Sequence, residues 1–346
     1  MGDIAKGVLA GAWTLLVGWI LPAAVNLAVL FFAVAPSLRH TALFARLWPT
    51  TGVNATLLLL AGAVLLGLML NALQNPLYRV LEGYLLWPAR AYDNACGQRR
   101  QEKWDLQDRL TLLRLQRRAQ TGDLLPADLR ADLVRLSQHP RIAKAARADL
   151  RRTAAQRALL REKLARYPVD DAQIAPTRLG NAIRRFEEYG YDRFRLDTQI
   201  LWNELTGTAP EQLRRQVDLA RASVDFFIAL LAGHAAVAGA AVAALVSADA
   251  RPATLTATAV VLGCLTPVWY RCAVSATDEW AAAVRALVNT GRKPLAESLG
   301  LVLPADIADE RRMWTFVGKL SRLPYDDRAA ALNPYRSAPP SGPSPT

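Results

Sequence analysis

The sequence predicts an all-α membrane protein in which two transmembrane helical hairpins flank a helical cytoplasmic insertion. Three observations lead to this fold class: four segments carry no Asp, Glu, Lys or Arg, they occur as two pairs, and a long charged stretch separates the pairs. A hydrocarbon core about 30 Å thick is spanned by roughly 20 apolar residues, and each segment supplies most or all of them. The charge-free segments are residues 7–35, 47–78, 226–248 and 252–270.

The first hairpin is expected to contain helices at residues 7–35 and 52–74. The first of these is much longer than the apolar core of a cleaved signal peptide, which has about 7–15 residues, so we expect a retained transmembrane helix. Pro22 predicts a kink in it, and a buried Asn26 is expected to form hydrogen bonds to another helix. The second helix begins near Asn54 and ends near Asn71.

The second hairpin is expected to contain helices at residues 223–247 and 252–271, joined by a very short turn. A helix that begins at Pro210 need not stop before the first of these two spans. Along it, Arg221 and Asp225 stand at i,i+4 spacing, which predicts a charge pair where the helix enters the bilayer.

The distribution of basic residues sets the expected orientation. Arg39, Arg46 and Arg251 are the basic residues in the two short loops inside the hairpins, and the other 39 of the 42 Lys and Arg residues lie elsewhere. Loops rich in Lys and Arg stay in the cytoplasm. The sequence therefore predicts a multi-pass protein of the cell membrane with both termini and residues 77–222 in the cytoplasm.

The insertion at residues 77–222 is expected to be helical, with amphipathic helices packed as a coiled or bundled stalk. Residues 98–166 contain 18 Lys and Arg against 8 Asp and Glu. Three partners fit this charge: anionic lipids of the inner leaflet, another protein or copy of the chain, and nucleic acid. Nucleic acid is the least favoured of these because the stretch has few aromatic residues and no recognised binding motif.

The remaining chain divides into a helical cytoplasmic segment at residues 272–332 and a tail at 333–346, which is rich in Pro and Ser and is expected to be disordered. The chain has six Lys residues among 42 basic ones, a bias towards Arg that indicates a bacterial source with a GC-rich genome.

Four polar residues inside the expected spans are candidate sites. Ionisable groups within a membrane are functional candidates by default, which points to a gating or proton-coupled role for His234. The alternative is a structural histidine bonded to a helix backbone or to one of two asparagines, Asn26 or Asn71. Asn54 completes the set of polar positions.

Catalytic machinery is not predicted, and we expect a protein that is not an enzyme. The sequence contains no P-loop, GxGxxG, GxSxG or HExxH motif. The three histidines are far apart, and no CxxC occurs. We therefore predict no cofactor, no metal site and no disulfide bond.

The stretch from Pro176 to Leu205, PTRLGNAIRRFEEYGYDRFRLDTQILWNEL, combines arginines, acids and aromatic residues. It predicts an amphipathic juxtamembrane helix at residues 177–190, which either lies at the bilayer interface or packs its apolar face on the stalk. Residues 194–201 fit a strand and a helix equally well. Glu187 and Glu188 are adjacent, so on a helix they point about 100° apart and make a poor acid/base pair.

This block, continued by APEQLRRQVDLARASVDF, resembles a recurring block in uncharacterised four-span membrane proteins of actinobacteria. The resemblance covers residues 176–227 and extends to RRMW at residues 311–314. It implies membership of that group and a membrane location, but no activity and no functional residues.

Two functional hypotheses follow from this organisation. The first is an oligomeric channel- or transport-like membrane assembly, supported by the paired spans and their polar residues. The second is a membrane-anchored scaffold or signalling protein that recruits a cytoplasmic partner through its basic insertion. An enzyme acting on lipid is a weaker third hypothesis, because no constellation of catalytic groups is visible.

Overall fold

Helices make up the regular structure of the chain. The computed structural model describes residues 11–41, 44–45, 51–122, 124–150, 154–323 and 327–336. Within those residues there is no β-strand, and Leu301 and Arg336 form an isolated antiparallel bridge. The chain divides into two compact units: unit 1 is Met1–Tyr78 with Gly190–Thr346, and unit 2 is Arg79–Tyr189. Residues 7–10 of the predicted first span and 337–346 of the predicted tail lie outside the described residues.

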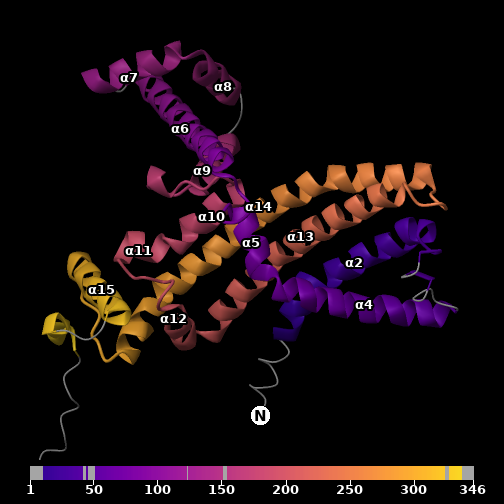
Figure 1. The fold of residues 1–346 in the computed structure, drawn as a ribbon. Helices are drawn as coiled ribbons and strands as arrows, with labels where there is room; N and C mark the ends of the chain where they lie inside the picture. The colour runs from indigo at the N-terminus through magenta and orange to yellow at the C-terminus, as the bar shows by residue number, and fades with distance from the viewer. Residues whose placement is uncertain are drawn as a thin grey trace, which may run out of the picture. The chain divides into compact units, whose positions relative to one another are not determined.

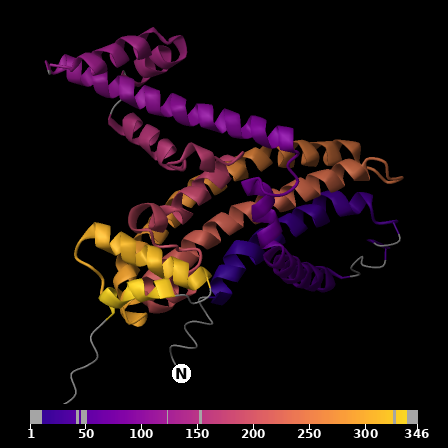
Figure 2. The same ribbon diagram turned by 60° about the vertical axis from the view of Figure 1, so that its left-hand side comes forward.

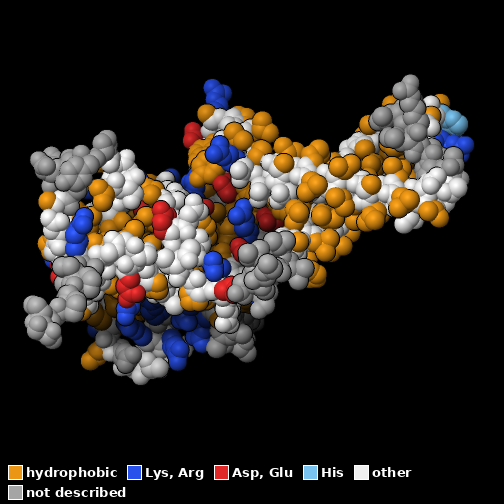
Figure 3. Space-filling view, turned by 90° about the horizontal axis from the view of Figure 1, so that it is seen from below, with side chains coloured by type: hydrophobic (Ala, Val, Ile, Leu, Met, Phe, Trp, Pro, Cys, Tyr) orange, Lys and Arg blue, Asp and Glu red, His pale blue; other side chains and the backbone are white. Residues whose placement is uncertain are grey.

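Four helical stretches are long and apolar enough to cross a membrane, and all belong to unit 1. They are Gly11–Ser37, α4 (Gly52–Ala72), α13 (Glu211–Ala244) and α14 (Pro252–Ser298). In the space-filling view, hydrophobic side chains gather along these helices and charged side chains are few there (Figure 3). Their length and composition make them candidate membrane spans, as expected of a membrane protein.

The first candidate span changes its helical pitch along its length. A π-helical turn, η1 (Leu16–Ile20), precedes α2 (Leu21–Val29), and a second, η2 (Leu30–Val34), leads into the 3-10 turn η3 (Ala35–Ser37). Pro22 is the second residue of α2, two positions after the end of η1. Its ring has no N–H to close a regular helical turn, which accounts for the widened turn before it.

α4 packs closely on the first span because glycines remove side chains from the contact. A Cβ atom at Gly67 would lie 2.8 Å from Ile20 Cα, and one at Gly62 would lie 2.7 Å from a methyl carbon of Leu27. The Thr51 side chain caps the start of α4 by accepting a hydrogen bond from the backbone N–H of Asn54 at 3.2 Å. α4 is followed by the short helix α5 (Gln74–Glu82).

α13 and α14 lie side by side over much of their length (Figures 1 and 2). A short connection at residues 245–251 joins them, and the end of the first span packs against both. α14 has 47 residues, so at about 1.5 Å per residue it is roughly 70 Å long and extends well past a bilayer core. The buried residues at this end are Val34, Val237, Ala241, Ala244, Leu255 and Leu262.

Short helices pack around the far half of α14. α11 (Tyr189–Phe194), α12 (Trp202–Thr208), α15 (Ile307–Arg322) and the 3-10 helix η5 (Asp327–Tyr335) complete unit 1. Gly291 admits α12, because a Cβ there would lie 2.8 Å from Leu205 Cδ1.

An ion pair holds α15 to α14. Arg292 donates from Nη1 to both carboxylate oxygens of the buried Glu310 at 2.9 Å, and Trp314 Nε1 donates to Glu310 at 3.2 Å. Arg311 donates to the carbonyl oxygens of Asp192 and Arg193 at 2.7 and 2.6 Å. Arg311 of the RRMW sequence therefore connects α15 to the end of α11.

Unit 2 is built on one long helix, α6 (Ala89–Gln120). α7 (Ala127–Gln138), α8 (Pro140–Leu150) and α9 (Ala154–Ala165) pack against it, and the 3-10 turn η4 (Asp171–Gln173) and α10 (Arg178–Glu187) follow. The spacing of leucines predicts this helical packing. The buried core is formed by Leu112, Leu113, Leu136, Ile142, Ala146 and Leu160.

An ion pair and hydrogen bonds hold the loop after α9 against α6. Lys103 is buried and donates to Asp171 Oδ1 at 2.6 Å and to the Val169 carbonyl at 2.7 Å. Trp104 Nε1 donates to the other oxygen of Asp171 at 2.8 Å. The hydrogen bond from Lys103 is the main reason that the pKa of Asp171 lies below its usual value.

A second group of polar contacts lies one residue earlier on α6, at Glu102. Glu102 accepts hydrogen bonds from Arg99 at 2.7 Å, from the Tyr167 hydroxyl at 2.9 Å and from Arg178 at 3.1 Å. Burial opposes ionisation of Glu102, but the bonds from Arg178 and Tyr167 outweigh it and lower its pKa. These charges serve packing within unit 2.

The PTRLGN sequence begins α10 and fixes its position. Thr177 caps the helix by accepting from the Gly180 N–H at 2.9 Å, and the buried Asn181 side chain bonds both backbone groups of Ala175. A Cβ at Gly180 would lie 2.7 Å from the Glu82 carbonyl oxygen. Gly83 has a φ of +97° and meets Pro176 closely, so it too must lack a side chain.

The predicted amphipathic helix at residues 177–190 corresponds to α10, followed by the separate helix α11. Its apolar side chains, Leu179, Ile183 and Phe186, are buried in protein. Of the two alternatives for this face, packing on protein therefore describes it. Beyond Phe194, Arg195 adopts a φ of +59°, and residues 195–197 form neither a strand nor a helix.

Candidate functional site

Two of the predicted polar residues, Asn26 and His234, meet in the interior of unit 1. Asn26 Oδ1 lies 2.7 Å from His234 Nδ1, and both side chains are buried. The Asn26 amide nitrogen donates to the carbonyl oxygens of Pro22 at 2.8 Å and Ala229 at 3.4 Å. Because its nitrogen faces carbonyl groups, its oxygen must accept, so we assign the proton on the imidazole to Nδ1.

A glycine provides the space for this contact. A Cβ atom at Gly233 would lie 2.1 Å from Asn26 Nδ2, so any other residue there would displace the asparagine. On the α14 side, the Trp269 ring stands edge-on to the His234 ring with centroids 5.9 Å apart. Trp269 Nε1 is buried and has no hydrogen-bond partner among the described residues. The histidine ring therefore lies between an amide and an indole.

A second polar group surrounds Asp225, which is also buried. The Tyr78 hydroxyl donates to Asp225 Oδ1 at 2.7 Å, whereas the Arg221 Nε atom lies 4.0 Å from Oδ2. Arg221 also donates to Gln74 Oε1 at 3.1 Å. Gly18 allows the first span to approach, since a Cβ there would lie 3.2 Å from Asp225 Cβ. The expected pairing of Arg221 with Asp225 is present, but Tyr78 is the closer partner.

The other two predicted positions stand apart from these groups. Asn54 is exposed in the first turn of α4, and Asn71 is half-buried in its last turn. Neither supplies an atom to the bond between Asn26 and His234. The structure thus brings together two of the four candidate polar residues.

Sequence reasoning missed three residues of these groups: Tyr78, Gly233 and Trp269. Tyr78 stands 147 residues before the aspartate that it contacts, and the sequence around Trp269 gives no indication of its contact with His234. One local signal points to a close helix contact: Gly233 stands next to His234 within an apolar run.

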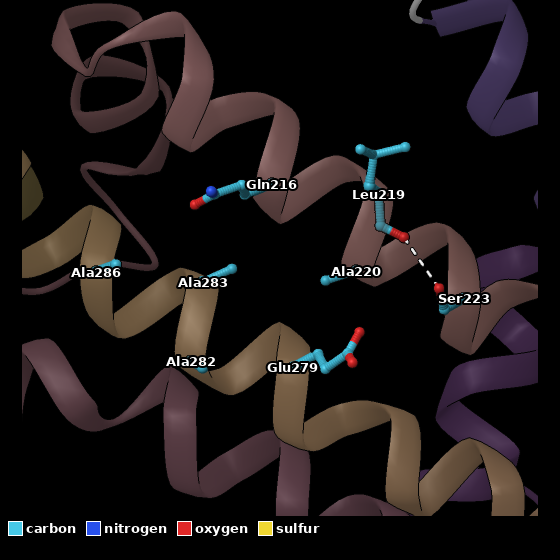
Figure 4. Close-up of a pocket in the computed structure, with 8 residues that line it drawn as sticks. All are labelled: Gln216, Leu219, Ala220, Ser223, Glu279, Ala282, Ala283 and Ala286. Carbon is cyan, nitrogen blue, oxygen red and sulfur yellow. Dashed lines mark hydrogen bonds between the residues drawn. The ribbon is translucent and has the colours of Figure 1, made fainter.

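A groove of about 460 Å³ lies between α13 and α14 (Figure 4). Alanines form much of its wall, and Gln216, Ser223 and Glu279 are its polar residues. The Ser223 hydroxyl donates to the Leu219 carbonyl at 3.2 Å, within α13 itself. His234 and Asn26 do not line this groove, so the buried polar pair and the open space are separate features. The lining residues are Gln216, Leu219, Ala220, Ser223, Glu279, Ala282, Ala283 and Ala286.

Unit 2 contains a titratable group of its own, at the contact of α10 with residues 79–82. Burial is the main reason that the pKa of Glu187 is raised to about 7, the charge of Glu82 adds to it, and Arg184 opposes it. Burial also raises the pKa of Glu82. After burial, the charge of Glu82 is thus the main cause that raises the pKa of Glu187, and the adjacent Glu188 contributes less.

Metal-binding chemistry finds no support in the described residues, which hold no group of three or more His, Cys, Asp or Glu side chains placed to bind an ion. The three cysteines are free: Cys96 is buried, Cys272 is half-buried and Cys264 is exposed. The described polar groups around His234 and Asp225 can donate and accept hydrogen bonds.

Comparison with known proteins adds no further assignment. No protein-family model matches the chain, and no curated protein or solved structure matches it significantly.

Proposed function

We propose that the protein is an oligomeric channel- or transport-like membrane assembly, with its four apolar helices crossing the bilayer as two hairpins. The observation that carries this proposal is the buried bond between His234 and Asn26 within candidate spans. An ionisable residue inside a membrane span is costly and is a candidate for an ion or proton pathway. Gly233 is matched to this pair, which supports a site formed with a defined geometry.

Exposed apolar surface supports assembly into oligomers. In the most apolar stretch of α14 11% of residues are buried, and in that of α4 17% are buried. A single chain leaves this surface to lipid or to another copy. Within the described residues neither Asn26 nor His234 lines the groove between α13 and α14, so the proposed pathway rests on the polar pair and not on that groove.

The proposed orientation places both termini and residues 77–222 in the cytoplasm of a bacterial cell, because the basic residues concentrate there. The proposed partners are the bilayer, with its anionic inner-leaflet lipids, and further copies of the chain. The proposal needs no cofactor and assigns no catalytic residue, since the acids of unit 2 are explained by packing and by burial.

Ion flux from liposomes under an imposed potential tests the proposal. Wild-type protein is expected to give flux above that of empty liposomes, and His234→Ala and Asn26→Leu are expected to change it. Asn54→Leu is the matched control, because it replaces an exposed asparagine of a candidate span outside the pair. No flux from folded and inserted protein, or equal flux from all four proteins, would overturn the proposal.

A second candidate function is a membrane-anchored scaffold or signalling protein. It is favoured by unit 2, which has its own leucine core and a surplus of basic residues. The test is capture of cytoplasmic proteins by residues 79–189 after circular dichroism has shown them to be helical. A specific protein retained beyond a charge-matched helical control would support the scaffold. Capture of no more protein than the charge-matched control would rule out the scaffold function.

A further inference from the structure

A group of exposed basic side chains lies on unit 2, at the end of α6 and on α8. Arg114, Arg117 and Arg118 stand in the last two turns of α6 and are exposed. Arg141, Lys144 and Arg147 are exposed on α8. We name these six residues the cationic surface. The core holds its two parts together, because Ile142 and Ala146 of α8 pack in one cluster with Leu112 and Leu113 of α6.

The direction of these side chains follows from the buried face of α8. Ile142 and Ala146 point inward, and at about 100° per residue Lys144 then points directly away from the core. Arg141 and Arg147 flank it on either side. α8 therefore presents its cations outward across most of its free face, an arrangement that packing within unit 2 does not require.

Among the side chains that the structure describes, no carboxylate is paired with this surface. Within the described residues, none of the six side chains forms an ion pair, whereas Arg135 of α7 pairs with Asp132 at 2.9 Å and Arg166 of α9 pairs with Glu162 at 2.7 Å. Arg147 has a weak bond to a carbonyl of its own helix. The charges of the cationic surface are thus available to an anionic partner.

An exposed apolar side chain follows the end of α6 in the sequence. Leu124 lies in the turn between α6 and α7 and is 91% exposed, while its neighbour Leu125 is buried. An exposed leucine that follows arginines in the sequence matches the interface of a bilayer, where the apolar side chain enters the acyl region and the cations meet phosphate groups. Binding to RNA or DNA would instead use exposed aromatic side chains for stacking. The exposed Trp104 is bonded to Asp171.

We propose that the cationic surface and Leu124 dock on the anionic leaflet of the same bilayer that the candidate spans cross. The inference rests on the membrane location in the proposed function, but not on ion flux. Both ends of unit 2 continue directly into unit 1, so the unit is tethered and its local concentration at the membrane is high. Six cations lie within the range of four to eight that is typical of basic clusters that bind anionic lipids.

Hydrogen exchange of the full chain in lipid nanodiscs tests this inference. In nanodiscs of phosphatidylcholine with one-third phosphatidylglycerol, peptides covering residues 114–147 are expected to exchange about threefold or more slowly than in pure phosphatidylcholine. Peptides of α15 are expected to exchange equally in both. Added NaCl at about 0.5 M should remove the difference, because it screens charges beyond about 4 Å.

Variants separate this surface from net charge. Arg141→Gln/Lys144→Gln/Arg147→Gln is expected to abolish the lipid-dependent slowing, and Leu124→Ser to reduce it. Lys293→Gln/Arg312→Gln/Lys319→Gln removes the same charge from unit 1 and should retain it. If the first triple variant does not fold, the lipid and salt comparison of the wild-type chain still decides the matter.

Three outcomes would overturn the inference: equal exchange in the two lipid mixtures, slowing that survives high salt, or greater slowing by single-stranded RNA in phosphatidylcholine nanodiscs than by phosphatidylglycerol. Lipid-dependent slowing in a protein without ion flux would leave this inference intact and remove the proposed channel alone.

Discussion

Unit 1 and unit 2 are both helical, yet their helices meet in different ways. In unit 1, Gly18, Gly62, Gly67 and Gly233 stand at helix contacts where a side chain would clash, and uncharged polar bonds add to the packing. In unit 2, leucines fill the core, and ion pairs such as Lys103 with Asp171 fasten its edge. Apolar helices in lipid gain little from further burial of apolar surface, so close approach at glycines replaces it.

The largest expected effect comes from filling a glycine contact of unit 1. Gly67→Ala places a Cβ 2.8 Å from the Ile20 backbone, so α4 and the first span must separate. We expect a loss of about 2–3 kcal/mol of unfolding free energy, measured by thermal unfolding in detergent. Gly239→Ala is the matched control in another candidate span, because a Cβ at Gly239 meets nothing within 4 Å. Equal losses of unfolding free energy in Gly67→Ala and Gly239→Ala would show that close packing at Gly67 does not stabilise unit 1.

A smaller effect is expected when an ion pair of unit 2 is broken. Asp171→Ala leaves the buried Lys103 ammonium with the Val169 carbonyl as its remaining partner, at an expected cost of about 2 kcal/mol. Asp132→Ala removes an acid from an exposed pair of the same unit and should cost less than about 0.5 kcal/mol. Chemical denaturation followed by hydrogen exchange of α6 would measure both. An Asp171→Ala variant as stable as the control would show that the ion pair between Lys103 and Asp171 does not stabilise unit 2.

The pH dependence of unit 2 comes next in size. The pKa of Glu187 is about 7 in the folded chain against 4.5 for the ordinary side chain, so the folded state binds the proton more tightly. Its contribution to stability is therefore complete below pH 4.5 and is lost as the pH rises through 7. Glu187→Gln should raise the unfolding free energy by about 1–2 kcal/mol at pH 8 and leave it unchanged at pH 4.

Unfolding curves of unit 2 between pH 4 and pH 8 would measure the effect of Glu187→Gln. Glu162→Gln, at an exposed position on α9, should leave the shape of the pH profile unaltered. A profile that is the same with glutamate or glutamine at position 187 would refute the role of this carboxyl group.

The smallest expected effect belongs to the buried bond of unit 1. Asn26→Leu removes the acceptor for His234 and the donor to two carbonyl groups. Hydrogen bonds between membrane helices average about 0.6 kcal/mol, so we expect a loss of about 1 kcal/mol. Asn71→Leu should cost less, and the two can be compared by unfolding in mixed micelles. A larger loss for Asn71→Leu would assign the important asparagine to α4.

Local patterns were sufficient to predict some features of this chain. The four apolar stretches and the leucine spacing of α6 depend on neighbours in the sequence, and the described helices agree with them. The helix expected at residues 177–190 is α10, which ends at Glu187, followed by the separate helix α11. The partner of His234 was left open between Asn26 and Asn71, because hydropathy treats both asparagines alike. Distance along the chain, 208 residues in this case, contains no information on which helix faces which.

Other features of the site depended on contacts between distant segments. Tyr78 is the closest partner of Asp225, whereas the i,i+4 rule pointed to Arg221. The PTRLGN sequence was the most distinctive part of the chain, and in the structure it serves packing: a cap at Thr177, a close approach at Gly180 and a bonded loop at Asn181. The distinctive PTRLGN sequence thus reflects packing within unit 2. Its residue types alone did not distinguish a packing role from a catalytic or binding role.

The unbroken length of α14 has a mechanical consequence. One helix contains Trp269, which touches the His234 ring, and Arg292, which holds Glu310 of α15. Pro267 removes one backbone bond near the first of these points and so gives the helix a pivot. A tilt of about 5° at this pivot would move Arg292, about 38 Å away, by about 3 Å. Because α14 is continuous from Trp269 to Arg292, a small tilt beside the histidine would be magnified where the helix meets α15.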